Sequence, residues 1–249
     1  MEKNLLEVKD LSVSFNTYAG EVQALRGISF SVARGETLAI VGESGSGKSV
    51  TVQTIMKLIQ MPPGEIKSGQ ILFNGEDLIT ISDEKMSKLR GGKIGMIFQD
   101  FRLLPNKTVY ENVAFAMEIV HKSQRKIKRQ VPLALKLMGI SSKANMFPDE
   151  LSAGEQQRVA IARAIINKPA MLIADEPTGN LDPATAWEIM NLLDEINKRG
   201  TTIVMVTHAK DIVDKMQKRV VTIESGKIVG DCIGKYRVPD SIGIGGERR

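Results

Sequence analysis

The sequence is poor in the side chains that build disulfides and metal clusters. It contains a single cysteine, Cys232, so no disulfide can form within one chain, and a reducing, cytosolic setting fits. With only two histidines, the chain offers no group of His and Cys ligands of the kind that holds zinc. These absences exclude disulfide-stapled secreted proteins and structural zinc proteins.

Long hydrophobic runs are also absent. A membrane-spanning helix needs about 18 or more consecutive apolar residues, whereas the best apolar runs, such as Thr37 to Val41, have the length of a strand. The first residues, Met1 to Asn4, carry an acid and precede no apolar segment with a small-residue cleavage site. We therefore expect a chain that neither crosses a bilayer nor is exported.

The composition is that of an ordinary globular protein, with 42% hydrophobic and 25% charged residues. The net charge of +5 is a weak indication of a nucleic acid or anionic lipid partner. The densest basic run, Lys122 to Arg129, contains no aromatic residue that could stack on bases. We interpret this run as a solvated helix face and expect no direct contact with nucleic acid.

The order of the predicted elements indicates an α/β fold. Alternating or continuous apolar residues predict strands over residues 5–15, 24–32, 37–41, 70–73, 94–98, 170–174, 202–206 and 220–223. Helical spacing covers residues 49–59 and 184–198. Strands that alternate with helices predict a mostly parallel sheet covered on its faces.

From about residue 100 to residue 166 the pattern is helical. Thr108 and Glu111 form a capping-box pattern that opens a helix to Val120, and a second helix over residues 125–138 is expected to be interrupted by Pro132. After Gly230 the chain is rich in glycine, and we expect a loose tail.

A glycine-rich pattern, G-x-x-x-x-G-K-S, follows one predicted strand and opens a helix. Glycines allow backbone N–H groups to wrap a polyphosphate, and a helix N-terminus favours negative charge. Lys48 is placed to reach the terminal phosphates and Ser49 to ligate Mg²⁺. A glycine-rich turn with a surface lysine is the alternative. The predicted phosphate site comprises Gly42, Glu43, Ser44, Gly45, Ser46, Gly47, Lys48, Ser49 and Val50.

Two adjacent carboxylates, Asp175 and Glu176, follow a buried strand, where ligands bind in open α/β sheets. Side chains alternate along a strand. Asp175 can therefore face the metal while Glu176 points toward an attacking water. Two acids at a strand end are also a common solvated cap. The pair indicates a catalytic site only in combination with the phosphate loop.

The segment from Leu151 to Glu155 opens a helix, and its Ser152-x-x-Glu155 pattern is itself a good capping box. The same N-terminus, with Ser152 and the Gly154 amide, is also a site for an anion, which could be the γ-phosphate bound on another subunit. The two interpretations are compatible.

Together these motifs, a glutamine after a strand and a late histidine resemble the ATP-binding cassette (ABC) family over nearly the whole chain. The resemblance implies a P-loop NTPase (RecA-like) ABC nucleotide-binding domain with an N-terminal antiparallel β subdomain and an inserted α-helical subdomain. It implies ATP and Mg²⁺ as cofactors, hydrolysis of ATP, and two ATPs buried between two copies.

The resemblance also assigns roles by position. Gln99 resembles the glutamine that senses Mg²⁺ and the partner, and His208 resembles the histidine near the γ-phosphate. Phe15 resembles the aromatic that stacks on adenine, with Tyr18 as the runner-up. The implied catalytic residues are Glu176, His208, Gln99 and Lys48, and the implied metal ligands are Ser49, Gln99 and Asp175. Ser152 and Gly154 are implied to touch the ATP held by the other copy. Glu155 and Asp182 are implied to bind ATP, and residues 180–182 resemble the D-loop of the family. Asp182 before Pro183 is also an N-cap.

One position departs from the family pattern. Family members usually have glycine where this chain has Ala153. A methyl group restricts φ and would crowd the approach to phosphate, so we expect hydrolysis that is retained but slowed.

The two parts of the chain resemble different subfamilies. Residues 5 to about 98 resemble the oligopeptide-importer ATPases, whereas residues 98–115 and 173–182 resemble the bacterial cell-division ATPases of the FtsE type. Natural divergence, recombination and a designed hybrid all remain open. In this family a coupling helix of the membrane subunit docks beside the helical insert, and the insert here is of the cell-division type. Importer ATPases typically add a longer, cysteine-rich C-terminal extension.

We therefore expect one cassette domain over residues 1–230, with a helical subdomain at about residues 100–166, and a loose tail over residues 231–249. The expected partners are a second copy and an integral, FtsX-like membrane protein, which would hold the chain at the cytoplasmic face of the membrane. The alternatives are a peptide or lipoprotein transporter ATPase, a soluble nucleic-acid-associated ATPase, and a nucleotide-gated switch with little turnover.

Overall fold

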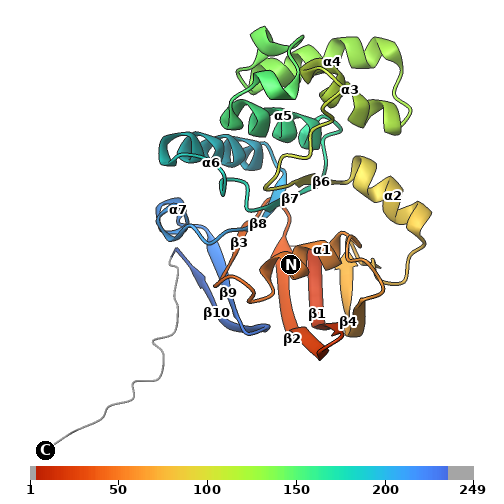
Figure 1. Ribbon diagram of the computed structural model, residues 1–249, viewed down its shortest axis with the longest axis vertical. Helices are drawn as coiled ribbons and strands as arrows, with labels where there is room; N and C mark the ends of the chain where they lie inside the picture. The colour runs from red at the N-terminus through yellow and green to blue at the C-terminus, as the bar shows by residue number, and fades with distance from the viewer. Residues whose placement is uncertain (1–3, 235–249) are drawn as a thin grey trace, which may run out of the picture.

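The computed structural model describes residues 4–234. Two sheets and a helical part make up the chain (Figure 1). One sheet is antiparallel, in the order β2-β1-β4-β5, and comprises β1 (Asn4–Thr17), β2 (Gly20–Ala33), β4 (Gly64–Phe73) and β5 (Glu76–Asp77). The two N-terminal strands confirm the prediction, and β4 begins six residues earlier than predicted because its whole length pairs with β1.

The second sheet has the order β10-β9-β3-β8-β7-β6. Its strands are β3 (Thr37–Val41), β6 (Ile94–Ile97), β7 (Met171–Asp175), β8 (Thr202–Val206), β9 (Arg219–Glu224) and β10 (Lys227–Ile233). Every neighbouring pair from β9 to β6 is parallel, and only β10 pairs antiparallel. The predicted, mostly parallel sheet is confirmed. The strands β3, β7 and β8 have five residues each, and every one of these residues is buried, as expected for strands covered on both faces.

Successive side chains of the parallel strands enter two different cores. On β3, Leu38 and Ile40 pack with α1 (Lys48–Ile55) and the antiparallel sheet. Ala39 and Val41 pack instead with the helices on the opposite face, which are α3 (Val109–Ile119), α4 (Gln124–Leu137), α5 (Ala153–Ile165) and α6 (Pro183–Lys198). The parallel sheet is therefore the middle layer, and α1 and α5 lie on opposite faces of it.

The helical part lies between β6 and β7 in the sequence, as predicted. The capping box at Thr108 opens α3 as expected. The interruption predicted at Pro132 is wrong, because α4 runs unbroken through it. Ile127, Val131 and Leu135 on the buried side of α4 are each at most 1% exposed, and this packing outweighs the hydrogen bond that proline removes. Two 3-10 turns, η1 (Ser141–Lys143) and η2 (Pro148–Glu150), connect α4 to α5.

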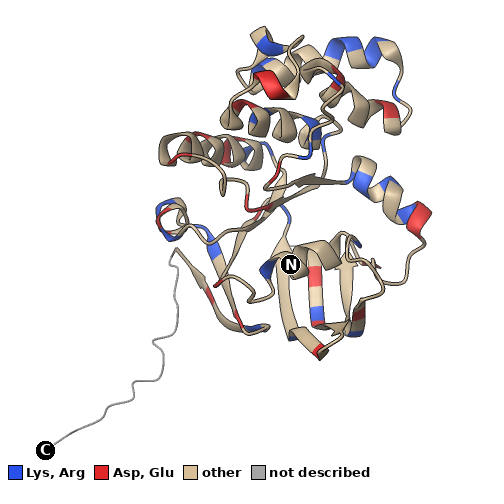
Figure 2. Ribbon diagram, viewed as in Figure 1, with Lys and Arg blue, Asp and Glu red and all other residues tan. Residues whose placement is uncertain are grey.

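The basic run, which begins just before α4 and continues along it, matches its interpretation. Lys122, Arg125, Lys126, Lys128 and Arg129 are all exposed. Figure 2 shows the blue segments of Lys and Arg along this helix.

Two further helices, α2 (Asp83–Gly92) and α7 (Lys210–Met216), are not among the predicted elements. At the C-terminal end, β10 continues past the predicted boundary at Gly230 as far as Ile233. The remainder of the predicted tail lies outside the described residues. Among residues 4–234, no helix combines the length and apolarity needed to span a membrane.

A buried asparagine organises the entry to the helical part. Asn112 on α3 is fully buried, and its Oδ1 accepts a hydrogen bond from the Leu104 amide at 2.8 Å. Its Nδ2 donates to the carbonyl oxygens of Leu104, Lys107 and Thr108 at 3.1, 2.9 and 3.0 Å. One side chain thus closes the loop between β6 and α3.

We predict that Asn112→Ala lowers the free energy of unfolding by on the order of 3 kcal/mol, because it leaves buried loop amides and carbonyls unpaired. Urea unfolding followed by circular dichroism measures the loss. The control is Glu118→Ala on the exposed side of α3, which should stay within about 0.5 kcal/mol of the parent. Equal losses in both variants would contradict this role of Asn112.

Candidate active site

The loop between β3 and α1 is built so that only glycine fits at two of its positions. A Cβ on Gly42 would lie 2.1 Å from the carbonyl oxygen of Ile223, and one on Gly47 would lie 2.7 Å from that of Ala24. Both glycines also have positive φ, at 150° and 108°. Sterics and backbone conformation therefore require these glycines.

This loop presents donors to a ligand. Gly47 is the N-cap of α1, and no side chain caps the helix, so its first amides are available to an anion. Lys48 is buried, and its Nζ donates to the carbonyl oxygens of Gly42 and Glu43 at 2.9 and 2.7 Å. Burial lowers the pKa of Lys48, while the carboxylates of Glu176 and Asp175 oppose this shift. Among the described residues, the buried Ser46 hydroxyl has no hydrogen-bond partner. The loop fits a polyphosphate.

Ser49 and Asp175 meet across the site although they are 126 residues apart in the sequence. The Ser49 hydroxyl donates to Oδ1 of Asp175 at 2.9 Å. Burial raises the pKa of Asp175 most strongly, the Ser49 hydrogen bond lowers it, and the neighbouring Glu176 raises it. Within residues 4–234 no group of three or more His, Cys, Asp or Glu forms a metal centre. A hydroxyl and a carboxylate beside a phosphate loop suit Mg²⁺, which keeps waters and phosphate oxygens as its other ligands.

Glu176 has an unusual backbone for its residue type. Its φ is +51°, a left-handed conformation that costs a non-glycine residue on the order of 1 to 3 kcal/mol. The Glu176 amide donates to the Val206 carbonyl at 3.0 Å, which fixes the turn after β7. Nδ1 of His208 then lies 2.5 Å from Oε2 of Glu176. The structure brings together the predicted water-polarising carboxylate and the predicted histidine.

Gln99 follows β6 and reaches the same place. Its carbonyl accepts a hydrogen bond from Nδ2 of Asn180 at 3.0 Å. A Cβ on Gly179 would lie 2.9 Å from Nε2 of Gln99 and 3.4 Å from Oε2 of Glu176, so the Gln99 amide lies near Glu176. The predicted contact of Gln99 with the metal stays a prediction.

The segment that opens α5 has the predicted capping box. The Ser152 hydroxyl accepts from the Glu155 amide at 3.3 Å and donates to Oε2 of Glu155 at 2.9 Å. The Ser152 amide also donates to Oε2 of Glu155 at 2.9 Å, and this hydrogen bond lowers the pKa of Glu155 most strongly, with a further lowering from the Ser152 hydroxyl. Lys143 lies 3.2 Å from the other carboxylate oxygen. Ala153, the first residue of α5, is exposed and helical. Its backbone is therefore unstrained, and only the predicted crowding of phosphate remains as a reason for slow turnover.

Gly154 is buried for a packing reason that the sequence did not indicate. A Cβ there would lie 2.5 Å from Cγ2 of Thr185 on α6. Asp182 caps α6 by accepting hydrogen bonds from the amides of Ala184 and Thr185 at 3.1 Å. The N-termini of α5 and α6 thus lie in contact, and the predicted role of Asp182 as an N-cap is confirmed.

The two aromatic candidates for adenine differ in environment. Phe15 is half-buried near the end of β1, and a Cβ on Gly64 would lie 3.3 Å from its ring. Tyr18 is fully exposed in the turn after β1. Stacking of either ring on adenine stays a prediction.

The sequence profile of the ABC transporter family matches residues 25–179. This match covers more than half of the chain and includes the phosphate loop, Gln99, the start of α5 and the Asp175-Glu176 pair. The chain belongs to the ABC family. It is accordingly an ATPase, and the resemblance predicted from the motifs is confirmed.

Among curated proteins, the cassette is 51% identical to the cell division ATP-binding protein FtsE of Bacillus subtilis over 227 residues, which are 91% of this chain and 96% of the relative. It is 49% identical to the oligopeptide transport ATP-binding protein OppD of Bacillus subtilis, covering 90% of this chain but 65% of that relative. The chain therefore resembles both subfamilies, and the predicted division between them near residue 98 stays a prediction.

Among solved structures, the cassette superposes with a TM-score of 0.83 on a dimeric, post-hydrolysis state of the ATP-binding cassette MJ0796 bound to ADP and Pi. The two share 30% identity, and the match covers 93% of this chain and 100% of that one. CbiO1 of Clostridium perfringens, part of a cbiONQ transporter complex, matches with 36% identity over 92% of this chain and 88% of its own, at a TM-score of 0.80. The predicted fold class is confirmed.

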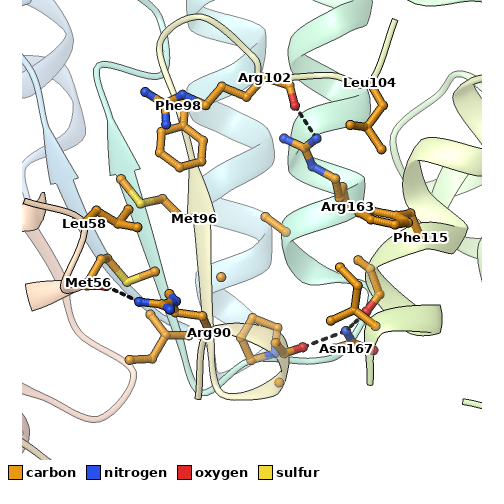
Figure 3. Close-up of a pocket in the computed structure, with 18 residues that line it drawn as sticks. Met56, Leu58, Arg90, Met96, Phe98, Arg102, Leu104, Phe115, Arg163 and Asn167 are labelled. Atoms are coloured by element: carbon orange, nitrogen blue, oxygen red, sulfur yellow. Dashed lines mark hydrogen bonds between the residues drawn. The ribbon is translucent and has the colours of Figure 1, made fainter. Parts of the chain in front are cut away.

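A groove of about 340 Å³ lies beside the Q-loop, by which we mean residues 98–102, and between the helical part and the core of the cassette (Figure 3). Met96 and Phe98 of the core face Phe115 of α3 across it. At its lower end Nδ2 of Asn167 donates to the carbonyl oxygens of Gly91 and Ala116 at 2.9 and 2.7 Å. The groove is thus fixed by hydrogen bonds from both sides.

We predict that Asp175→Asn raises the Tm of the nucleotide-free cassette by roughly 2 to 4 °C, the shift that about 1 kcal/mol produces in a protein of this size. Asp175 has a raised folded pKa, so its ionisation opposes folding. The two proteins should be equally stable below the ordinary aspartate pKa. The difference in their Tm should grow as the pH rises above that value and be complete above the raised folded pKa.

Calorimetry over a range of pH, with and without MgATP, measures the difference in Tm between the parent and Asp175→Asn. The control is Asp149→Asn, an exposed carboxylate outside the site, which should not change the Tm. MgATP should stabilise the parent but not Asp175→Asn. A lower Tm for Asp175→Asn without nucleotide would contradict the argument from burial.

Proposed function

We propose that two copies of this chain sandwich two MgATP molecules and drive an FtsX-like integral membrane protein in bacterial cell division. The observation that carries the cell-division assignment is coverage. The match to FtsE of Bacillus subtilis spans 96% of that protein, whereas the match to OppD spans 65% of OppD. An oligopeptide importer ATPase is the second candidate, because the identity to OppD is nearly as high.

The layering of the fold supports a site shared between two copies. The phosphate loop opens α1 on one face of the parallel sheet, whereas Ser152 opens α5 on the other face. Ser152 is exposed, so its hydroxyl and the start of α5 are accessible to a second molecule. The relative MJ0796 forms a dimer in the state bound to ADP and Pi. Each copy would supply the phosphate loop to one ATP and the start of α5 to the other.

The residues of the site have distinct tasks in this proposal. Backbone amides of the phosphate loop and Lys48 bind the phosphates, and Ser49 with Asp175 would hold Mg²⁺. The ion offsets phosphate charge when it is bound. Glu176 orients and polarises the attacking water, and His208, 2.5 Å from the Glu176 carboxylate, orients that carboxylate and faces the developing charge.

The groove beside the Q-loop is the proposed docking site for the membrane partner. It adjoins Gln99, whose amide lies near Glu176, and its walls carry apolar side chains such as Met96 and Phe115. A partner bound there would contact the segment that leads to the hydrolytic carboxylate. Binding through this partner would hold the chain peripherally at the cytoplasmic face of the membrane.

We predict that Glu176→Gln retains MgATP binding, loses at least about a hundredfold in turnover, and accumulates as an ATP-bound dimer. The phosphate loop is untouched, while the group that activates water is lost. Phosphate release and size-exclusion chromatography with light scattering measure both effects. Glu195→Gln, on the exposed side of α6, is the matched control. A variant that stays monomeric with saturating MgATP would refute the sandwich.

The identity of the partner is tested with the same trapped variant. Glu176→Gln is captured from detergent-solubilised membranes with MgATP, and the integral protein that co-purifies is identified by mass spectrometry. We expect an FtsX-like protein, present with MgATP and reduced without it. A solute permease would overturn the cell-division assignment in favour of an importer, and the absence of any integral protein would overturn the membrane role.

A further inference from the structure

An arginine in the last turn of α5 donates hydrogen bonds to the Q-loop. Arg163 lies in the last turn of α5, and its guanidinium donates to two consecutive carbonyl oxygens, that of Phe101 at 2.8 Å and that of Arg102 at 2.5 Å. Figure 3 shows the Arg163 side chain directed at the Arg102 carbonyl across the top of the groove. The two nitrogens of one planar fork thus bind two neighbouring peptide groups.

The two Q-loop residues that Arg163 binds have an unfavourable backbone conformation. Phe101 and Arg102 have φ values of +57° and +46°, so two successive non-glycine residues are left-handed. Left-handed L-residues are normally isolated and persist where surrounding contacts impose them. The Phe101 and Arg102 amides donate to the nearby carbonyls of Phe98 and Asp100 at 3.3 and 2.6 Å. The guanidinium of Arg163 is the long-range contact that holds the two carbonyls in this arrangement.

Arg163 has no acidic partner for this task. Within the part of the chain that the structure describes, both of its hydrogen bonds go to main-chain carbonyls and no carboxylate lies within ion-pair distance. The side chain is half-buried, and burial lowers its pKa. Arg163 is therefore not part of a surface ion pair with any residue that the structure describes. Its charge is partly removed from water, and its hydrogen bonds go to two carbonyls of the Q-loop.

The Q-loop segment bound by Arg163 also contacts the groove wall and contains Gln99. The Arg102 guanidinium lies over the Phe98 ring at 4.1 Å and its Nε is 3.2 Å from Oδ1 of Asp100. Gln99 lies between Phe98 and Asp100, and its own carbonyl is held by Asn180. The segment that positions Gln99 is therefore fixed from one side by Asn180 and from the other by Arg163.

We propose that Arg163 is a positioning residue for ATP hydrolysis, which ties the Q-loop to α5 so that the helix carrying Ser152 at its start also sets the position of Gln99. The helix has 13 residues, which span about 20 Å at 1.5 Å per residue. A shift of α5 against the core would then move the Phe101 and Arg102 carbonyls with it. This proposal rests on the ATPase activity and on the proposed role of Gln99, and not on the identity of the membrane partner.

The test compares Arg163→Met and Arg163→Lys with Arg158→Met in the full-length protein. Lysine keeps the charge but lacks the fork that reaches two carbonyls. Arg158 is the matched control because it lies on the same helix and also donates to a carbonyl, that of Met138 at 3.1 Å, without reaching the Q-loop. We measure kcat and KM for MgATP, the Tm, and hydrogen–deuterium exchange of residues 98–102.

We expect both Arg163 variants to lose about tenfold in kcat, with KM within about twofold of the parent, because the phosphate loop is untouched. Exchange should rise in residues 98–102 and not at the phosphate loop. Arg158→Met should keep the parent's kcat and its exchange in this segment. Adding Phe101→Gly to Arg163→Lys should restore part of kcat, since glycine adopts positive φ without strain.

Several results would overturn the proposal. These are a parent-like kcat in both Arg163 variants, an equal loss in Arg158→Met, or unchanged exchange at residues 98–102. Should Arg163→Met fail to fold, Arg163→Lys alone decides. A parent protein without ATPase activity would instead refute the proposed function, so the two failures are distinguishable.

Discussion

Strands that run in one direction end at one edge of a sheet, and the site depends on this constraint. The parallel neighbours β3, β8, β7 and β6 deliver the phosphate loop, His208, the Asp175-Glu176 pair and Gln99 to the same edge. These residues span most of the chain, from Gly42 to His208. Three long-range contacts then set their relative positions: Ser49 with Asp175, His208 with Glu176, and Asn180 with Gln99.

The parallel sheet separates the phosphate loop from the helical part. One face carries α1 and the antiparallel sheet, and with them the phosphate loop. The other face carries the helical part with Ser152 and Arg163, and the groove lies between this part and the core of the cassette. The two faces meet at the strand ends, where Gln99 and Glu176 lie close together. Glu176, and Phe101 with Arg102 a few residues beyond β6, have left-handed backbones near these strand ends, although other left-handed residues lie elsewhere in the described chain.

Features that depend on a few consecutive residues could be predicted from the sequence. The phosphate loop, the carboxylate pair and the caps at Thr108, Ser152 and Asp182 are such patterns, and the structure has them where they were expected. Features decided by distant partners could not be predicted. The length of β4 depends on β1, the continuity of α4 through Pro132 depends on its buried face, and the need for glycine at position 154 depends on Thr185 of another helix.

Arg163 illustrates the limit most clearly. It is one of several arginines and lysines in its stretch of sequence, and nothing local distinguishes it. Its partners, the carbonyls of Phe101 and Arg102, are 62 and 61 residues away. Main-chain carbonyls carry no residue identity, so the contact leaves no complementary pattern in the sequence. Only the fold shows that this side chain is directed at the Q-loop.

The capping box at α5 has a consequence for how an anion is received there. A serine hydroxyl has a single hydrogen, and that of Ser152 is already given to the Glu155 carboxylate at 2.9 Å. A phosphate bound there, as proposed, would compete with Glu155 for this hydrogen. Glu155 would still accept from the Ser152 amide and keep Lys143 within 3.2 Å. The exchange of one hydrogen-bond acceptor for another can thus occur without uncapping the helix.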